Sequence, residues 1–195
     1  SGVVSVYSSA DSSYALLNDE TPRSWGYNTY GALGDGSGSN RSYPVQISGL
    51  TTTVAALATG NNFALAQMSD GTLMAWGYNN YGQLGDGSVS TRYSAVPVSS
   101  IGGARQTLAI NNVAGVIKDD GSLWLWGYNG QGALGDGTYS SSNIPVRPLF
   151  SGCDLGVTPD SGPTEGGTDV TIYGTNFISG ATVTFDGVPA TNVIF

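Results

Sequence analysis

Apolar and polar positions in the first 150 residues form short segments that glycine-containing turns separate. In two places an Asp-Gly turn separates two apolar runs. The first pair of runs is at residues 63–68 and 72–76, and the second pair is at residues 113–117 and 122–126. This order predicts β-hairpins. No helix of useful length is indicated, so the pattern predicts an all-β chain.

The hairpins belong to a longer repeat. The phrase WGYNxxGxLGDG occurs three times, at steps of 51 and 50 residues, and it begins at Trp25, Trp76 and Trp126. A period of this size indicates a repeat architecture. An aspartate stands six residues before each tryptophan, but in the first copy Glu20 takes the place of the turn glycine. We therefore expect the first turn to be built differently.

A polar loop and a strand follow each phrase, and we expect these strands to begin at Pro44, Pro97 and Pro145. Glycine is expected in the phrase itself because the chain turns twice within it and needs positive φ angles. Trp124 and Trp126 fall on one face of a strand by the period of two. The tryptophans are most simply core residues, and a ligand-stacking role is the alternative.

The pattern changes after residue 150. Alternating strands are predicted at residues 169–173, 181–185 and 191–195, between turns that contain Gly and Pro. The chain is therefore divided into repeats at residues 1–150, a linker at residues 151–156 and the start of a second β domain at residues 157–195.

The spaced phrase, with its preceding Asp-Gly turn, resembles the repeats of the regulator of chromosome condensation family. The resemblance implies one four-stranded blade of a β-propeller per repeat, so residues 1–150 are expected to form a partial propeller of about three blades. It also implies that the three phrase tryptophans lie between blades, and that an asparagine braces the turn of each phrase: Asn28, Asn79 and Asn129.

The family's founding member is a nucleotide exchange factor for a nuclear GTPase, with basic and histidine-bearing surfaces. This chain has no histidine. That activity is therefore not carried over.

Residues 157–195 resemble the opening of an IPT/TIG domain, an immunoglobulin-like module. The matching positions include Pro159, Gly174 and the Gly-Val-Pro-Ala segment at residues 187–190. Such a domain needs roughly twice this length, so we expect an incomplete immunoglobulin-like β-sandwich with unpaired strand edges. The chain is therefore expected to be a segment of a longer protein.

Composition excludes several functions. The net charge is −8 and Lys118 is the only lysine, so no basic stripe could neutralise a nucleic acid backbone. No stretch approaches the roughly 20 apolar residues of a membrane span. Without histidine the chain lacks the commonest general base, and Cys153 lacks its usual activating partner and any internal disulfide partner. We expect no catalytic residue, no cofactor and no enzymatic activity.

The acidic residues give no site either. Asp35, Asp86 and Asp136 recur in Gly-Asp-Gly, but calcium needs six to eight oxygens, and no dense acidic string supplies them. They are expected to cap glycine turns. Asp119 and Asp120 are neighbours on a turn and point apart, so they predict no two-carboxylate site. No metal site is predicted.

Binding is better supported. Five tyrosines recur within or beside the WGYN turns, and tyrosine provides rigid contact area at low entropic cost. They are candidates for contact with a protein or a glycan, with the covering of turns as the alternative reading: Tyr27, Tyr30, Tyr78, Tyr81 and Tyr128. Asn40 begins an N-glycosylation sequon, which has meaning only in a secreted eukaryotic protein.

Charged residues are only 10% of the chain. The low charge, the single lysine and the presence of two types of β module favour an extracellular or cell-surface protein with a structural or adhesion role. Its partners would be surface proteins, glycans or other copies of itself. A secreted, inhibitor-like binding propeller is the first alternative. An intracellular regulator of a GTPase is the second.

Overall fold

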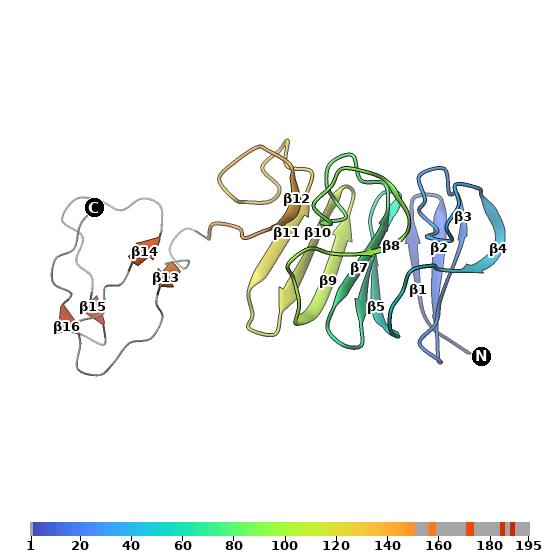
Figure 1. Cartoon of the computed structure of the whole chain (residues 1–195), viewed down its shortest axis with the longest axis horizontal. Coiled ribbons are helices and arrows are strands. Elements are labelled where there is room, and N and C mark those ends of the chain that lie inside the picture. The colour runs from blue at the N-terminus through green and yellow to red at the C-terminus, as the bar shows by residue number, and fades with distance from the viewer. Residues whose placement is uncertain (1, 151–155, 159–170, 174–183, 186–187, 190–195) are drawn as a thin grey trace. The chain divides into compact units, whose positions relative to one another are not determined.

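The computed structural model describes residues 2–150 and, toward the C-terminus, residues 156–158, 171–173, 184–185 and 188–189 (Figure 1). The chain divides into two compact units, Ser1–Pro148 and Leu149–Phe195. Every regular element in the described residues is a β-strand. The predicted all-β class is confirmed.

The first unit contains three four-stranded antiparallel sheets, each made of four consecutive strands in chain order. The first sheet comprises β1 (Val3–Ser9), β2 (Ser12–Leu17), β3 (Pro22–Gly26) and β4 (Arg41–Gln46). The second comprises β5 (Val54–Thr59), β6 (Phe63–Met68), β7 (Leu73–Gly77) and β8 (Arg92–Pro97). The third comprises β9 (Ala104–Ile110), β10 (Val113–Lys118), β11 (Leu123–Gly127) and β12 (Ser142–Val146). Within this unit the sheets follow one another side by side (Figure 1), as the repeats predict.

The two predicted hairpins are confirmed as β6–β7 and β10–β11. Each is closed by a turn glycine at positive φ, 80° for Gly71 and 81° for Gly121. The Gly71 amide donates to the Met68 carbonyl at 3.0 Å, and the Gly121 amide donates to the Lys118 carbonyl at 2.9 Å. Glycine suits these turns because it adopts positive φ without steric cost.

The turn between β2 and β3 has the same geometry, so the prediction of a differently built first turn is wrong. Glu20 adopts a φ of 61°, and its amide donates to the Leu17 carbonyl at 2.9 Å. Asp19 Oδ1 accepts from the backbone amide of Thr21 at 3.1 Å and from its hydroxyl at 2.6 Å. A glutamate thus occupies a conformation that favours glycine.

Replacing Glu20 with glycine is expected to raise the free energy of unfolding by about 0.5–1 kcal/mol. Relief of the positive-φ strain, about 1–2 kcal/mol, exceeds the entropy that glycine adds to the unfolded chain. Urea unfolding followed by circular dichroism measures the change. The reverse substitution Gly71→Glu in the matched turn should lower stability, and a stabilising Gly71→Glu would contradict the argument.

The outer strands differ from the prediction in where they begin. β4, β8 and β12 start at Arg41, Arg92 and Ser142, so the prolines lie inside or at the end of these strands. Each strand is the edge of its sheet and pairs with one other strand only. Proline, which has no amide hydrogen, is tolerated there.

Two hydrophobic cores fill the spaces between neighbouring sheets. Side chains of β6 alternate between them: Ala64 and Ala66 face the first sheet, and Phe63 and Leu65 face the third. Both faces of the middle sheet are therefore buried, as the period of two along a strand requires. Trp76 lies in the first core.

In the second unit, β13 (Gly156–Thr158) pairs antiparallel with β14 (Thr171–Tyr173), and β15 (Thr184–Phe185) pairs with β16 (Val188–Pro189). β14 and β15 fall within two of the predicted strands. The predicted strand at residues 191–195, Cys153 and most of the predicted linker lie outside the described residues.

Candidate functional site: a row of tyrosines across three sheets

A buried asparagine organises each WGYN loop. Asn79 is fully buried, and its Nδ2 donates to the carbonyls of Ser88 and Ser90, both at 3.1 Å, and to Asp86 Oδ1 at 3.2 Å. Its Oδ1 accepts from the Leu84 amide at 3.0 Å. Asn28 makes the same four bonds, and Asn129 makes three of them, to Asp136, the Thr138 carbonyl and the Leu134 amide. The bracing role that the family resemblance implied for these residues is present in all three loops.

The Gly-Asp-Gly aspartates are bonded to their own loops. Asp86 Oδ1 accepts from the amide and hydroxyl of Ser88, and its Oδ2 accepts from Arg92 Nε at 2.8 Å. Asp35 has the equivalent ion pair with Arg41 at 2.7 Å. These contacts agree with the turn-capping role expected from the sequence.

The same contacts set the protonation of Asp86. Burial raises the pKa of its carboxyl, but the hydrogen bonds from Arg92 and Ser88 outweigh burial and hold the pKa below the ordinary value of 3.8. A carboxyl with a lowered pKa in the folded state stabilises the fold above its ordinary pKa, and the contribution disappears as the pH falls through the lowered value. The loops should therefore loosen only in strong acid.

The third loop lacks the arginine, because Ser142 occupies the place of Arg41 and Arg92. Ser142→Arg is expected to raise the free energy of unfolding by about 0.5 kcal/mol, the scale of a partly exposed ion pair, by pairing with Asp136. Urea unfolding measures the gain. In an Asp136→Asn background the gain should vanish, and an unchanged gain would show that no ion pair forms.

Tryptophans tie neighbouring sheets together below the loops. Trp76 Nε1 donates to the Ala32 carbonyl at 2.9 Å, and Trp126 Nε1 donates to the Gln83 carbonyl at 3.0 Å. Both side chains are fully buried, as the core reading predicts. Trp25 is only half-buried, because no sheet covers its face among the described residues.

The approach of each tryptophan to the preceding sheet depends on a glycine of the phrase. A side chain at Gly34 would lie 2.8 Å from Trp76 Cδ1, and one at Gly85 would lie 2.7 Å from Trp126 Nε1. Both glycines also have a φ of 65°. The absence of a side chain at these glycines therefore leaves room for the indole rings, and their positive φ angles form the turn.

The five predicted tyrosines lie together in one continuous row, which we call the tyrosine row. Successive ring centroids are 6.3, 5.2, 6.1 and 5.0 Å apart, and the planes of neighbouring rings meet at 63–75°. In order, the row is Tyr27, Tyr30, Tyr78, Tyr81 and Tyr128. Edge-to-face contact at these distances is favourable for aromatic rings.

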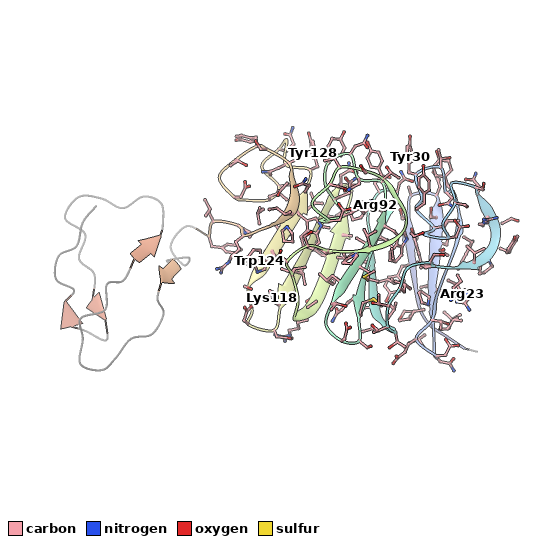
Figure 2. The ribbon with its side chains drawn as sticks, viewed as in Figure 1. Arg23, Tyr30, Arg92, Lys118, Trp124 and Tyr128 are labelled. Atoms are coloured by element: carbon pink, nitrogen blue, oxygen red, sulfur yellow. The ribbon has the colours of Figure 1, made fainter. Side chains whose placement is uncertain are left out.

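The row crosses both boundaries between sheets. Tyr30 contacts Tyr78 of the next repeat, and Tyr81 contacts Tyr128 of the repeat after that. Figure 2 shows Tyr30 and Tyr128 at the same end of the first unit, away from Arg23 and Lys118. Tyr30 is 41% exposed and Tyr81 is 38% exposed. The row thus presents aromatic surface at the loop end of three sheets.

The tyrosine row has a defined end in the third repeat. In the third repeat Gln131 replaces the second tyrosine. The hydroxyl of Tyr128 lies against Gly130, where any side chain would collide with it. Residues 25–34, 76–85 and 126–135, which carry the row, contain no charged residue.

The sequon asparagine has a structural partner. Asn40 is exposed, and its Oδ1 accepts from the Asn28 amide at 2.8 Å, a place that Ser141 takes in the third loop. This bond accounts for Asn40 without a glycan. Glycosylation of Asn40 stays a prediction.

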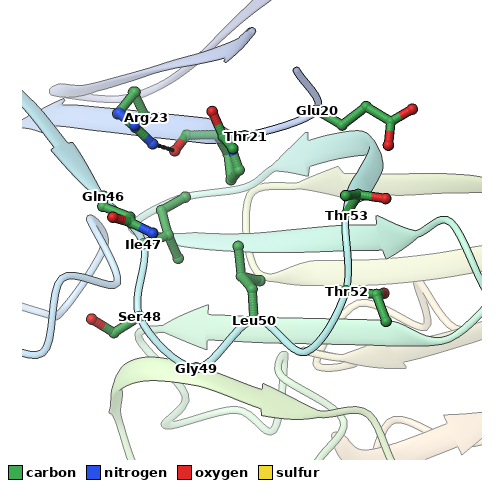
Figure 3. Close-up of a pocket in the computed structure, with 11 residues that line it drawn as sticks. Glu20, Thr21, Arg23, Gln46, Ile47, Ser48, Gly49, Leu50, Thr52 and Thr53 are labelled. Carbon is green, nitrogen blue, oxygen red and sulfur yellow. Dashed lines mark hydrogen bonds between the residues drawn. The ribbon is translucent and has the colours of Figure 1, made fainter. Parts of the chain in front are cut away.

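Sequence reasoning did not predict a pocket of about 440 Å³ beside the first sheet (Figure 3). The turn after β2 and the connection from β4 to β5 line it, and Glu20 and Arg23 are its only charged lining residues. Arg23 donates to the Pro22 carbonyl at 3.0 Å.

The described residues lack two further features. No three acidic or cysteine side chains in that part of the chain lie close enough together to hold a metal ion. The same part has no helix with the length and apolar character of a membrane span.

Family models match most of the chain. The regulator of chromosome condensation (RCC1) repeat matches residues 24–67, 70–110 and 120–153, and a second model of this repeat matches residues 54–83. The IPT/TIG domain matches residues 155–195. The first match runs from β3 to β6 and the second from β7 to β9, so each of these two continues from one sheet into the next, while the third covers β11 and β12.

Two curated relatives are similar over part of their length. The Ultraviolet-B receptor UVR8 of Arabidopsis thaliana is 30% identical over 105 residues, which is 53% of this chain and 24% of UVR8. The E3 ubiquitin-protein ligase HERC2 of Homo sapiens is 36% identical over 74 residues, which is 37% of this chain and 2% of HERC2. The chain thus spans a quarter or less of either relative.

Two solved structures have a similar fold. Prp20p from Saccharomyces cerevisiae has a TM-score of 0.70 at 19% identity, over 80% of this chain and 40% of its own. Human WBSCR16 has a TM-score of 0.66 at 28% identity, over 74% of this chain and 37% of its own. Because the repeat model matches more than half of the chain, the chain belongs to the regulator of chromosome condensation (RCC1) repeat family, and its repeats are followed by an IPT/TIG domain.

Proposed function

We propose that this chain is a segment of a longer, non-enzymatic structural or adhesion protein of the cell surface. In this proposal the stacked sheets form a rigid scaffold, and the tyrosine row is the surface that contacts a protein, a glycan or another copy of the chain. The tyrosine row is the observation that carries the proposal.

Three properties of the tyrosine row support a contact role. It is continuous over three sheets, so its rings are fixed relative to one another by the two buried cores below them. Two of its rings are more than a third exposed. Tyrosine in a rigid setting loses little conformational entropy on binding and is enriched at the centres of interfaces.

The composition supports a surface protein rather than an enzyme. Only 10% of the residues are charged, and the chain has no histidine for acid–base chemistry. The acidic residues of the loops are engaged in hydrogen bonds within their own loops. Function then depends on contact area instead of on reactive groups.

A secreted propeller that binds and inhibits one target protein is the second candidate. The placement of the row on a loop end favours it, because loops on a rigid scaffold are a common binding surface. Regulation of an intracellular GTPase is less favoured, since one lysine and five arginines provide little basic surface.

Adhesion of beads coated with the whole chain tests the proposal. The beads are placed on surfaces that carry extracellular proteins, glycans or the chain itself, and the retained fraction is counted. We expect retention on at least one surface, and its loss in the variant Tyr30→Ser/Tyr81→Ser. Retention on no surface, or equal retention of the variant, would refute adhesion through the row.

The matched control is Tyr43→Ser/Tyr139→Ser, which alters two exposed tyrosines that form none of the ring contacts of the row. This control should be retained as the unmodified chain is. Stoichiometric inhibition of a single enzyme by the soluble chain, without bead retention, would favour the inhibitor-like alternative instead.

A further inference from the structure

We propose that copies of this chain associate head to tail, with the third sheet of one copy packed against the first sheet of the next. This association goes beyond the proposed function, because it uses the faces of the sheets and not the tyrosine row. The first and third sheets lie at the two ends of the first unit (Figure 1). Their outer faces carry the two sides of an interface that already occurs twice inside the chain.

The two internal interfaces share one set of contacts. The later sheet provides a tryptophan whose indole nitrogen donates, and the earlier sheet provides the accepting carbonyl and a glycine that leaves room for the ring. In the first interface these residues are Trp76, Ala32 and Gly34. The two accepting residues, Ala32 and Gln83, are fully buried. Formation of such an interface therefore buries its acceptor.

The third sheet has an acceptor side that no other sheet of the first unit covers. Ala133 lies in the phrase where Ala32 lies in the first repeat, but Ala133 is exposed. Gly135 takes the place of Gly34. The described atoms nearest to a side chain at Gly135 belong to Pro148, at 3.3 Å, and not to a tryptophan. The place of the indole is thus left open.

The first sheet has the donor side. Trp25 is half-buried, and its indole nitrogen has no hydrogen-bond partner among the described residues. Trp76 and Trp126 are fully buried and bonded. Trp25 of one copy and the Ala133 carbonyl of another therefore supply the pair of groups that each internal interface contains.

The outer face of the third sheet, which we call the acceptor face, is apolar. By the period of two, it carries the residues that alternate with the core residues of β10 and β11. Its large side chains, none of them buried, are Leu108, Ile110, Val113, Ile117, Leu123 and Leu125. At matching positions of the middle sheet, Phe63, Leu73 and Ala75 are at most 2% exposed. A sheet on the acceptor face would remove similar apolar area from water.

The outer face of the first sheet, which we call the donor face, is more mixed. Strand pairing places on it Val6, Ser8, Ser13, Ala15, Arg23 and Trp25. Val6 is 72% exposed. Arg23 takes the place of the buried Met74, but its aliphatic stem can cover apolar surface while the guanidinium stays at the solvent. The donor face can therefore be covered without burial of its one charge.

Contact between two different faces can pass from copy to copy, and it gives closed rings or open chains. Sedimentation equilibrium of the 195-residue chain measures this association. We expect the average mass to rise above the 19.9 kDa of one chain as the concentration increases. The mass of one chain at every concentration would overturn the proposal, whatever else covers the two faces.

Two acidic substitutions block one face each. Val6→Asp alters the donor face, and Ile110→Asp, at a residue that is 63% exposed, alters the acceptor face. Each variant alone should have the mass of one chain, because an unpaired carboxylate is costly to bury. An equimolar mixture should form a complex of two chains and no more, since it contains one intact face of each type.

No association in the mixture would contradict head-to-tail packing. Association of Ile110→Asp alone would show that two donor faces pair with each other, which also overturns the proposal. Val89→Asp is the matched control, because Val89 is 58% exposed in the loop between β7 and β8 and lies on neither face. It should associate as the unmodified chain does, and an equal loss there would refute the assignment to the two faces. Circular dichroism checks the fold of each variant.

Trp25 provides an optical signal for the same contact. Association should shift the tryptophan emission to shorter wavelengths, because Trp25 passes from half-buried to buried. The shift should follow the rise in mass and should be absent in Trp25→Phe. A shift of equal size in Trp25→Phe, at equal association, would show that Trp25 is not part of the interface.

Discussion

Replacing Trp76 with alanine is expected to lower the free energy of unfolding of the repeat unit by about 3–5 kcal/mol. The side chain is fully buried between the first two sheets, and its indole nitrogen donates to the Ala32 carbonyl. The substitution removes a large apolar volume from a packed core. It also removes one of the two donors to the Ala32 carbonyl, which keeps the bond from the Tyr14 hydroxyl at 2.6 Å. Urea unfolding followed by circular dichroism measures the effect.

Trp25 is the matched control, because it begins the same phrase but is only half-buried. Trp25→Ala should cost about 1–2 kcal/mol, since less apolar area is lost from a partly exposed site. Trp76→Phe should fall between the two, because it keeps most of the ring volume and removes the donor. Equal losses for Trp25→Ala and Trp76→Ala would contradict a role for contacts between sheets.

Replacing Asn79 with alanine is expected to lower the free energy of unfolding by about 3 kcal/mol. The amide group of Asn79 serves two carbonyls, one carboxylate and one backbone amide, all inside the loop that carries Tyr81. Alanine removes this partner from two carbonyls and from the Leu84 amide, while Asp86 keeps its bonds from Ser88 and Arg92. Thermal unfolding measures the loss, and broadened tyrosine resonances in NMR spectra would report a loosened loop.

The adjacent Asn80 is exposed and provides the control. Asn80→Ala should change stability by less than about 0.5 kcal/mol, as surface substitutions usually do. Asn79→Asp keeps the shape but loses both amide hydrogens, so it should be at least as harmful as Asn79→Ala. A mild effect of Asn79→Asp would show that the carbonyl bonds are unimportant.

The hairpins of the second and third sheets could be predicted because their turns follow a local rule. Asp-Gly between two apolar runs specifies both the turn and the pairing of the strands. The first turn was mispredicted because that rule treats glycine as a requirement. Contacts outside the turn hold Glu20 at positive φ, including the bond from the Val54 amide to the Glu20 carbonyl.

The outer strands were placed incorrectly for a related reason. Local propensity alone predicts that a proline lies at the first residue of a strand. On an edge strand, however, half of the amides face away from the neighbour, so Pro44 can lie within β4. Which strand is the edge depends on the assembled sheet and cannot be read from the local sequence.

The residues of the candidate site could be predicted from the sequence, but their arrangement in one row could not. The five tyrosines could be named because they recur in the repeated phrase. Their union into one row depends on how far each sheet is rotated and shifted against the next, and the buried cores set that geometry. For the same reason, the sequence could not distinguish the half-buried Trp25 from the fully buried Trp76.

The bonds from the tryptophans to the preceding sheet have a consequence for how such chains can evolve. Ala32 lies seven residues after Trp25 and Gln83 lies seven residues after Trp76, so each repeat carries its own indole donor and, close by, the carbonyl that receives the next donor. A gene duplication that inserts one whole repeat therefore recreates both halves of each joint without any compensating mutation. The number of repeats can then change in a single genetic step while every junction between sheets is preserved.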